Sequence, residues 1–203
     1  MTVDGAYFDA MYSSSDDPWG FRSRWYERRK RALSTAALTR ERYGRAFEPG
    51  CSIGLLTGDL ASRCDRVLAW EGSAEAASLA REESAGAGNV LVRCARIPAE
   101  WPEGPFDLVV LSELLYYFDD GDLASVLGRT RDSLGPGGTV LAVHWRHHVP
   151  EHARSGDDAH RALAAVPGLE RVVEHVEEDF LLDLYQASDA GGPVSVARAG
   201  GLV

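Results

Sequence analysis

From Gly44 onward, short apolar segments of strand length alternate with segments of helical period. This alternation is typical of a parallel sheet covered by helices, because consecutive parallel strands need a crossover connection. We predict strands at 45–48, 66–70, 90–94, 106–111 and 139–144, and helices at 55–62, 74–83 and 123–134. The last helix should stop at the turn Gly135-Pro136-Gly137-Gly138. Together these segments predict five β–α units.

Two more apolar segments, 169–176 and 180–186, are separated by only three acidic residues, which predicts an antiparallel hairpin that completes a seven-stranded sheet. Ahead of the sheet, one face of a predicted helix over 24–37 carries Trp25, Arg29, Ala32, Leu33 and Ala36. We therefore expect an N-terminal helical extension or lid (1–42), a domain that contains the sheet (43–189) and a flexible tail (190–203).

The composition limits the classes of partner. The formal net charge of −10 argues against a nucleic-acid partner, although residues 1–50 carry 9 basic and 7 acidic residues and could face an anionic group. The apolar runs are too short to span a bilayer and no signal-type segment follows Met1, so we expect a cytoplasmic protein without a membrane partner. The 3 cysteines lack C-x-x-C spacing, and we expect all of them to be small buried residues.

The first predicted strand runs into Glu48-Pro49-Gly50-Cys51-Ser52-Ile53-Gly54, and Glu71 closes the second strand. Glycines at this place let the backbone approach a ligand, and an acidic side chain about 20 residues further on can accept hydrogen bonds from a ribose. A phosphate loop would need Gly-Lys-Ser/Thr, and a dinucleotide fingerprint would need a third glycine where 55–57 stand. The pattern therefore predicts a nucleoside cofactor without phosphate.

Glu48-x-Gly50-x-x-x-Gly54, the acidic end of the second strand, the Pro136-Gly137-Gly138 turn and the final hairpin together resemble class I S-adenosylmethionine-dependent methyltransferases. Segments 17–21, 25–30, 106–113 and 143–146 are similar to the NodS family, whose nodulation members N-methylate a deacetylated chitooligosaccharide. The resemblance extends over 7–186. It implies a Rossmann-like fold with a C-terminal antiparallel hairpin and an N-terminal helical cap, S-adenosylmethionine as cofactor, S-adenosylhomocysteine as product, and no metal.

The resemblance also implies the acceptor, an amine on a sugar, an oligosaccharide or a similar small polar metabolite. An O-methyltransferase of a secondary metabolite, a cofactor-binding protein without turnover and, as a weaker alternative, an NAD-dependent oxidoreductase remain open, as does the oligomeric state. This chain departs from the family at Ser52, where glycine is usual, and at Glu71, where aspartate is common. Serine fits the loop if its φ is negative.

Several residues are expected at the cofactor. Arg29 must meet either a carboxylate of the fold or the methionine carboxylate, because it lies on an apolar face, and Trp19 and Trp25 are alternatively core anchors. No acidic residue follows the third strand, so backbone and apolar groups should hold the adenine there. The full expected set is Trp19, Tyr26, Arg29, Glu48, Gly50, Cys51, Ser52, Gly54, Glu71, Gly72, Ser73, Ala95, Arg96, Ile97, Ser112 and Glu113.

The candidates for the chemistry are Glu113, Tyr117 and His144. Glu113 follows the fourth strand and either accepts a proton from the amine or is bonded to backbone. Tyr116 and Tyr117 should wall the acceptor pocket, with one of the two facing the core. His144, at the exit of the fifth strand, either contacts the substrate and transfers a proton or is bonded to a neighbouring loop. Four histidines crowd 144–152, but Pro150 breaks the helix that a metal-binding pair would need.

Overall fold

The structure is a computed structural model that describes residues 1–188 and 192–203. Its strands are β1 (Tyr43–Pro49), β2 (Cys64–Glu71), β3 (Val90–Cys94), β4 (Phe106–Ser112), β5 (Leu134–Trp145), β6 (Leu169–Val176) and β7 (Phe180–Ala187). Its helices are α1 (Gly5–Ser14), α2 (Trp25–Ala37), α3 (Leu55–Ala61), α4 (Ala74–Glu83), α5 (Asp120–Ser133), α6 (Gly156–Ala164) and α7 (Val196–Ala199), with a 3-10 turn η1 at Leu115–Tyr117.

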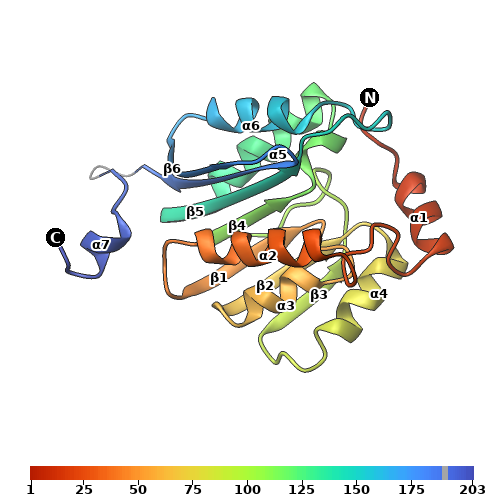
Figure 1. Ribbon diagram of the computed structural model, residues 1–203, viewed down its shortest axis with the longest axis horizontal. Coiled ribbons are helices and arrows are strands. Elements are labelled where there is room, and N and C mark those ends of the chain that lie inside the picture. Colours follow the sequence, from red (N-terminus) through yellow and green to blue (C-terminus); the bar gives the residue numbers. More distant parts are fainter. Residues whose placement is uncertain (189–191) are drawn as a thin grey trace.

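The strands form one sheet of 7 strands in the order β3-β2-β1-β4-β5-β7-β6 (Figure 1). β1 to β5 pair in parallel, whereas β7 is antiparallel to both β5 and β6. The predicted mostly parallel sheet with a C-terminal antiparallel hairpin is confirmed. Because the chain passes from β1 outward to β3 and then returns to β4, the strand order reverses between β1 and β4. Open α/β sheets bind ligands at the carboxyl ends of the strands beside such a reversal.

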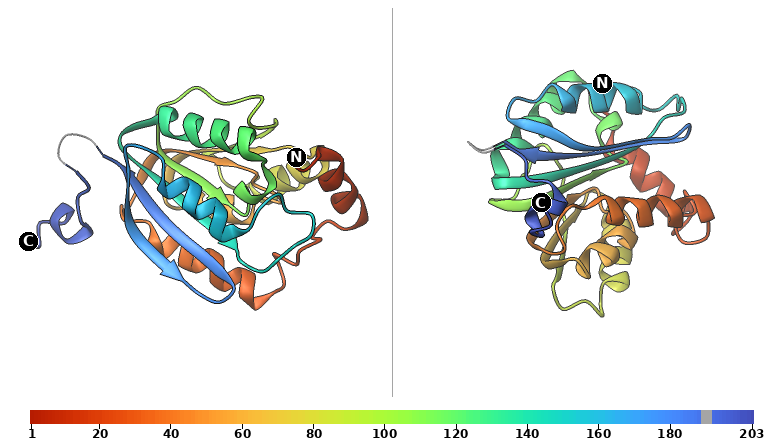
Figure 2. Two further views of the ribbon diagram at one scale, coloured as in Figure 1. Left: turned by 90° about the horizontal axis from the view of Figure 1, so that it is seen from above. Right: turned by 60° about the vertical axis from the view of Figure 1, so that its left-hand side comes forward.

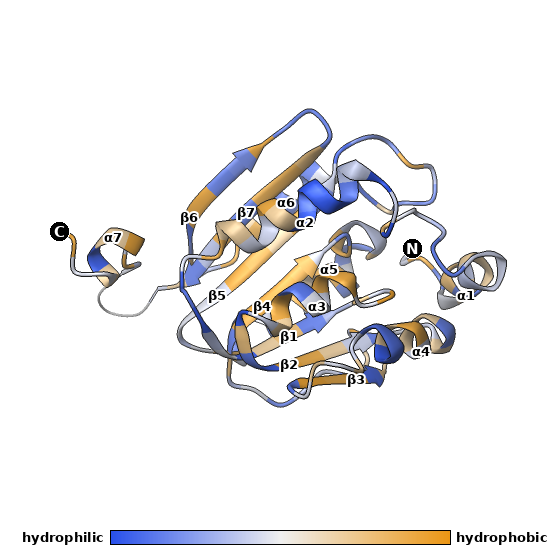
Figure 3. Cartoon of the chain, turned by 60° about the horizontal axis from the view of Figure 1, so that its bottom comes forward, coloured by the Kyte–Doolittle hydropathy of each residue, from blue (hydrophilic) through white to orange (hydrophobic). Residues whose placement is uncertain are grey.

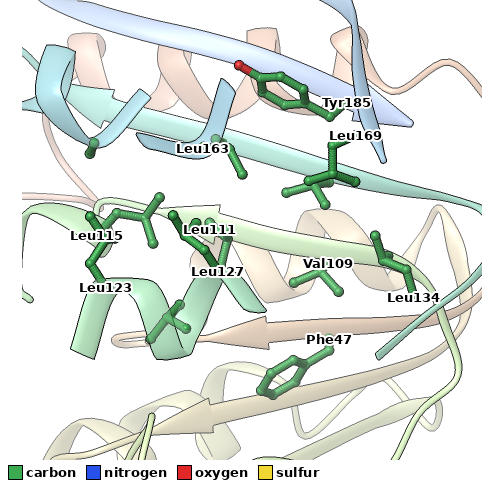
Figure 4. Packing of buried hydrophobic residues seen from close by; sticks show 14 of the residues in the cluster. Phe47, Val109, Leu111, Leu115, Leu123, Leu127, Leu134, Leu163, Leu169 and Tyr185 are labelled. Atoms are coloured by element: carbon green, nitrogen blue, oxygen red, sulfur yellow. The ribbon is translucent and has the colours of Figure 1, made fainter. Parts of the chain in front are cut away.

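Helices cover both faces of the sheet (Figure 2). α5 and α6 pack on the face that carries Phe47, Val109, Leu111 and Tyr185 (Figure 4). α2 and α3 pack on the opposite face with Leu108, Val110, Leu141 and other residues of alternating position. β4 is therefore buried on both sides, which explains its unbroken apolar run. Each fully buried leucine contributes roughly 1.5–3 kcal/mol by leaving water.

Four expectations about the fold are wrong. Residues 95–105, all of which the structure describes, contain no helix, so there are fewer than five β–α units. β5 begins at Leu134, so the predicted turn at 135–138 is already strand. Cys94 is exposed because β3 is an edge strand, whereas Cys51 and Cys64 are buried. Trp25 is 69% exposed and anchors no core, because it stands in the first turn of α2.

Three helices were not predicted: α1, α6 and α7. α1 begins at the N-cap Asp4, and α6 begins with a capping box between Ser155 and Asp158. The predicted flexible tail (190–203) begins at residues 190 and 191, which lie outside the described residues, and α7 follows them as a helix of 4 residues. None of the helices in the described ranges is long and apolar enough to cross a membrane.

Candidate active site

A cavity of about 570 Å³ opens at the carboxyl ends of β1, β2 and β4. The N-terminal extension covers it, because α1, the segment after α1 and the first turns of α2 all supply wall residues. Its wall includes these expected site residues: Trp19, Tyr26, Glu48, Gly50, Cys51, Ser52, Glu71, Gly72, Ala95, Arg96, Ile97, Ser112, Glu113 and Tyr117.

The loop after β1 brings its backbone against the cavity. The amides of Gly50 and Cys51 donate to the Trp70 carbonyl at 2.7 and 3.0 Å, and Gly50 has a φ of +71°. A Cβ at Gly50 would lie 3.0 Å from Leu114 Cδ1, so a side chain there would press on the wall of the cavity. The glycine is therefore required both by its backbone conformation and by the space beside it.

Ser52 has a φ of +53°, so the expectation of a negative φ is wrong. The left-handed region costs a residue with a Cβ roughly 1–2 kcal/mol. Two contacts hold the serine there: its amide donates to Glu71 Oε2 at 2.8 Å, and its hydroxyl is hydrogen-bonded to Tyr12 Oη at 2.5 Å. The N-terminal extension thus fastens the loop at the position where the family usually has glycine.

Glu71 is held with its carboxylate toward the cavity. Oε2 accepts from the Ser52 amide and Oε1 accepts from the Ser73 amide at 3.0 Å, and the side chain is buried. Burial raises the pKa of Glu71, and the backbone donors act in the opposite direction. A carboxylate offers about four lone-pair sites, so two remain for a ligand. This arrangement suits a pair of ribose hydroxyls.

Glu48 lies deeper in the same wall. It accepts a hydrogen bond from Thr57 Oγ1 at 2.6 Å, and burial raises its pKa to about 8. At neutral pH most of this carboxyl is therefore protonated. A cation placed beside it would lower the pKa and release the proton.

The walls from β4, β5 and α2 meet at an acidic end of the cavity. Glu113, whose φ is +52°, accepts from Lys30 Nζ at 2.6 Å, from the Trp145 amide at 3.0 Å and from the Tyr116 hydroxyl. Lys30 is only 5% exposed and stays charged, because the pKa gain from Glu113 and Glu27 outweighs the effect of burial. We call Glu27, Lys30 and Glu113 the acidic cluster, since two carboxylates share one ammonium group.

α2 supplies two members of the acidic cluster that the sequence analysis did not select. The first half of this helix is strongly hydrophilic (Figure 3), yet Glu27 and Lys30 are buried against the cavity. Beside them, the Tyr26 hydroxyl is buried with no hydrogen-bond partner among the described residues. A sequence signal did exist, because Lys30 is the only lysine of the chain.

His144 lies outside the cavity, so the expected substrate contact is wrong. Its side chain is completely buried, and Nε2 accepts from the Leu115 amide at 3.0 Å. Nδ1 lies 3.0 Å from His160 Nε2, and His160 Nδ1 lies 2.7 Å from Asp183 Oδ2. Because Nε2 is an acceptor, neutral His144 donates from Nδ1 to His160 Nε2, and His160 in turn donates from Nδ1 to Asp183. Burial lowers the pKa of His144 well below its ordinary value.

Other expected residues also fall outside the cavity wall. Arg29 makes two hydrogen bonds of 2.7 Å to Glu177 in the β6–β7 turn, so its partner is a carboxylate of the fold. One residue along a helix turns a side chain by about 100°, which explains why Lys30 faces the cavity and Arg29 does not. Gly54 instead packs against α4, where a Cβ would lie 3.0 Å from Ala80 Cα. Ser73 serves through its amide to Glu71.

Both adjacent tyrosines contribute atoms to the cavity wall. Tyr116 is only 3% exposed and lies among the buried residues, whereas Tyr117 is half-buried, so one of the two faces the core as expected. The crowded histidines have separate partners: His147 lies 2.7 Å from Asp179, and His152 stacks on Tyr116 with ring centroids 3.9 Å apart. Within the described ranges, no three His, Cys, Asp or Glu residues converge as a metal site would require.

An open α/β sheet with a glycine turn after β1, an acidic residue at the end of β2 and a cavity at their carboxyl edge defines a nucleoside-cofactor enzyme. The family model of the methyltransferase domain matches residues 46–138. The chain is 46% identical to a Pseudomonas syringae protein described as a putative methyltransferase, with 80% of this chain and 99% of that chain covered and a TM-score of 0.72.

Other matches agree. Nodulation protein S of Rhizobium tropici is 28% identical over 130 residues, which is 63% of this chain and 55% of that protein. The S-adenosylhomocysteine complex of the N-methyltransferase NodS from Bradyrhizobium japonicum has a TM-score of 0.81 at 21% identity, with 91% and 99% of the two chains covered. This chain belongs to the class I S-adenosylmethionine-dependent methyltransferases, and S-adenosylmethionine is its cofactor. Its fold is that of NodS.

Proposed function

We propose that the protein transfers a methyl group from S-adenosylmethionine to an amine of a small polar metabolite, of which amino sugars and their oligosaccharides are the first candidates. The observation that carries this proposal is the acidic cluster. Two carboxylates, Glu27 and Glu113, share the single ammonium of Lys30, so the acceptor end has a net charge of −1 when both are ionised. A buried net charge is stabilised by a ligand of opposite charge.

The cavity walls fit the cofactor, and the proposed roles follow from that fit. Glu71 would hold the ribose through its two unused lone-pair sites, and Glu48 would meet the cationic amino group of the methionine part. Ala95, Arg96 and Ile97 would flank the adenine. When bound, the cofactor supplies an activated methyl group. The protein then has to align the acceptor nitrogen and keep its lone pair free.

The name of NodS as an N-methyltransferase adds support for nitrogen as the acceptor atom. The hydroxyl of Tyr26, which has no hydrogen-bond partner in the described part of the chain, lies beside the acidic cluster and offers a donor or an acceptor to a polar substrate. Aromatic walls from Tyr117 and Trp145 suit the apolar face of a sugar ring.

The test combines binding with turnover. Calorimetry with S-adenosylmethionine and S-adenosylhomocysteine measures the cofactor half by itself. Methyl transfer is then measured with glucosamine, with chitosan oligomers and with N-acetylglucosamine, which has the same hydroxyls but no free amine. We expect transfer to glucosamine or its oligomers and none to N-acetylglucosamine. Equal transfer to both sugars would indicate O-methylation, and cofactor binding without any transfer would refute the proposed acceptor class.

A further inference from the structure

The two carboxylates of the acidic cluster differ in how far their hydrogen-bonding capacity is used. Glu113 accepts from three donors on three elements: Lys30 of α2, the Tyr116 hydroxyl of η1 and the Trp145 amide of β5. Among the described residues, Glu27 accepts only from Lys30, whose Nζ lies 3.2 Å from Oε1 and 3.1 Å from Oε2. With about four lone-pair sites on each carboxylate, Glu27 has more capacity left for a ligand.

Glu27 is also better placed to change its charge. It stands on the cavity wall and is 8% exposed. Lys30, three residues further along α2, lies on the same face of the helix and holds the carboxylate in position. Burial raises the pKa of Glu27, and Lys30 partly opposes this effect. A carboxylate with a raised pKa is the better proton acceptor near neutral pH.

We propose that Glu27 binds the ammonium group of the acceptor and takes its proton, whereas Glu113 is a positioning residue that fixes Lys30 and the Tyr116 hydroxyl. This inference rests on the proposed amine methylation and reverses the role that the sequence suggested for Glu113. Glu113 joins α2 to the ends of β4 and β5, so its three donors are also the links that hold the acceptor pocket together.

The proton and electron balance is closed. The acceptor R–NH3⁺ loses one proton to a Glu27 oxygen, which leaves a lone pair on nitrogen. That lone pair forms the N–C bond while the C–S bond breaks and its electron pair stays on sulfur. The products are R–NH2⁺–CH3 and the neutral thioether, and Glu27 returns its proton to solvent. No oxidant or metal is needed.

The charged groups that face Glu27 decide the pH dependence. Lys30 and Arg31 on its own helix favour the carboxylate, whereas Glu113, which shares the Lys30 ammonium group, disfavours it. Because Lys30 stays protonated, the change in charge of this pair as the pH rises comes from the ionisation of Glu27. Methyl transfer should therefore increase with pH through the pKa of Glu27. Without Glu27, the rate should depend instead on the small fraction of acceptor that is already neutral.

The only lysine of the chain gives a direct readout that needs no turnover. In protein labelled with ¹⁵N-lysine, the side-chain ammonium signal comes from Lys30 alone. The chemical shift of this signal should change as the neighbouring Glu27 ionises, at a pH above the ordinary range for a glutamate. This step should disappear in Glu27→Gln and persist in Glu113→Gln. A step that disappears only in Glu113→Gln would assign the titrating carboxylate to Glu113 and overturn the inference.

Kinetics with glucosamine complete the test. We expect Glu27→Gln to lower kcat by about 10²–10⁴-fold at pH 7, with the rate recovering as the pH approaches the pKa of the amine. Calorimetric binding of S-adenosylhomocysteine should remain unchanged. Glu113→Gln should raise KM and keep a pH-dependent step, with its midpoint shifted below that of the wild type because the charge of Glu113 raises the pKa of Glu27. If Glu27→Gln folds poorly, Glu27→Asp retains the carboxylate and should retain the pH midpoint with a lower kcat.

The outcomes separate the two proposals. If wild-type protein methylates glucosamine and Glu27→Gln stays within about threefold of it, the amine function stands and the role of Glu27 is wrong. If wild-type protein methylates only hydroxyl acceptors, the proposed function is wrong, whereas the lysine titration still reports which carboxylate ionises. Activity of Glu27→Gln without the recovery at high pH would also overturn the inference, because proton removal would then not limit the rate.

Discussion

Replacing Lys30 by methionine tests the acidic cluster most directly. Lys30 Nζ lies 2.6 Å from Glu113 and 3.1 Å from Glu27, and its side chain is only 6% exposed. Methionine keeps an unbranched apolar stem but removes the charge. Loss of one partner of a buried ion pair costs about 3–5 kcal/mol, because the remaining charge is buried without compensation. We expect Lys30→Met to lower the free energy of unfolding by this amount.

This loss in the free energy of unfolding is large for a single domain. Total stabilities are about 5–15 kcal/mol, and each kcal/mol shifts Tm by about 2–4 °C in a domain of this size. Tm should therefore fall by about 6–20 °C. Urea unfolding followed by circular dichroism gives the free energy directly. Arg42→Met is the matched control: its partner Asp65 is 60% exposed, so loss of that pair should cost at most about 1 kcal/mol.

The loss of stability in Lys30→Met should also depend on pH in a defined direction. Lys30 is the first cause that lowers the pKa of Glu27, so without it the folded pKa rises further above the unfolded value. A carboxyl with a raised folded pKa loses stability as the pH rises through that pKa. Lys30→Met should therefore be less destabilised at pH 5 than at pH 8. A change below about 0.5 kcal/mol at pH 8, or a deficit that grows toward pH 5, would refute the buried ion cluster.

Three further changes follow from the structure. Glu71→Ala should weaken S-adenosylhomocysteine binding in calorimetry by tens to hundreds of fold, since a hydrogen bond to a charged group contributes about 1.5–3 kcal/mol; exposed Glu75→Ala is the control. Tyr12→Phe should lower the free energy of unfolding by about 0.5–1.5 kcal/mol, because the hydrogen bond to Ser52 is lost. In the Tyr12→Phe background, Ser52→Gly should be stabilising because glycine relieves the positive φ. If the effects of the two single changes on urea unfolding simply add in the double variant, the two residues are not coupled and this prediction is contradicted. His144 is neutral in the folded state, so below about pH 6.5 the unfolded state binds one more proton than the folded state. The free energy of unfolding should therefore fall by up to about 1.4 kcal/mol per pH unit. In urea unfolding, His144→Gln should lack this pH dependence, and the exposed control His148→Gln should retain it.

The sheet could be predicted because its strands carry their own signal. The bounds of β3, α4 and β6 agree with the sequence, since apolar runs or helical periods end at turns there. α6 was missed because its sequence mixes aspartates and a histidine with small residues, and only its capping box marks the start. His160 on α6 is buried because it pairs with Asp183 on β7, which is 23 residues away in the sequence. Local patterns do not encode such pairings.

His144 could have been assigned correctly from strand alternation. Side chains of a strand point alternately to opposite faces, so Val140, Ala142 and His144 share one face of β5. Val140 and Ala142 pack with the cluster under α5 and α6, which is also where His160 lies. Position at the carboxyl end of a strand therefore predicts nearness to the cavity, whereas strand parity decides which side chain enters it.

The proposed cofactor half of the site could be predicted because Glu48, Gly50, Ser52 and Glu71 belong to one β1–α3–β2 unit, where the loop bonds to its neighbouring strand. The proposed acceptor half could not be predicted, because Glu113 contacts Lys30, which is 83 residues away in the sequence. No local spacing predicts that contact. The only available signal was compositional, a single lysine in a chain that otherwise uses arginine.

That single lysine has a physical explanation in the acidic cluster. An ammonium group is a compact charge whose three donors can point to different acceptors, whereas a guanidinium is planar and matches one carboxylate through two parallel bonds. Lys30 serves carboxylates on two sides and also lies 4.9 Å from the centre of the Tyr26 ring. The lysine therefore leaves Glu27 with free lone pairs and the cluster with an excess negative charge, which are the two properties that an ammonium acceptor requires.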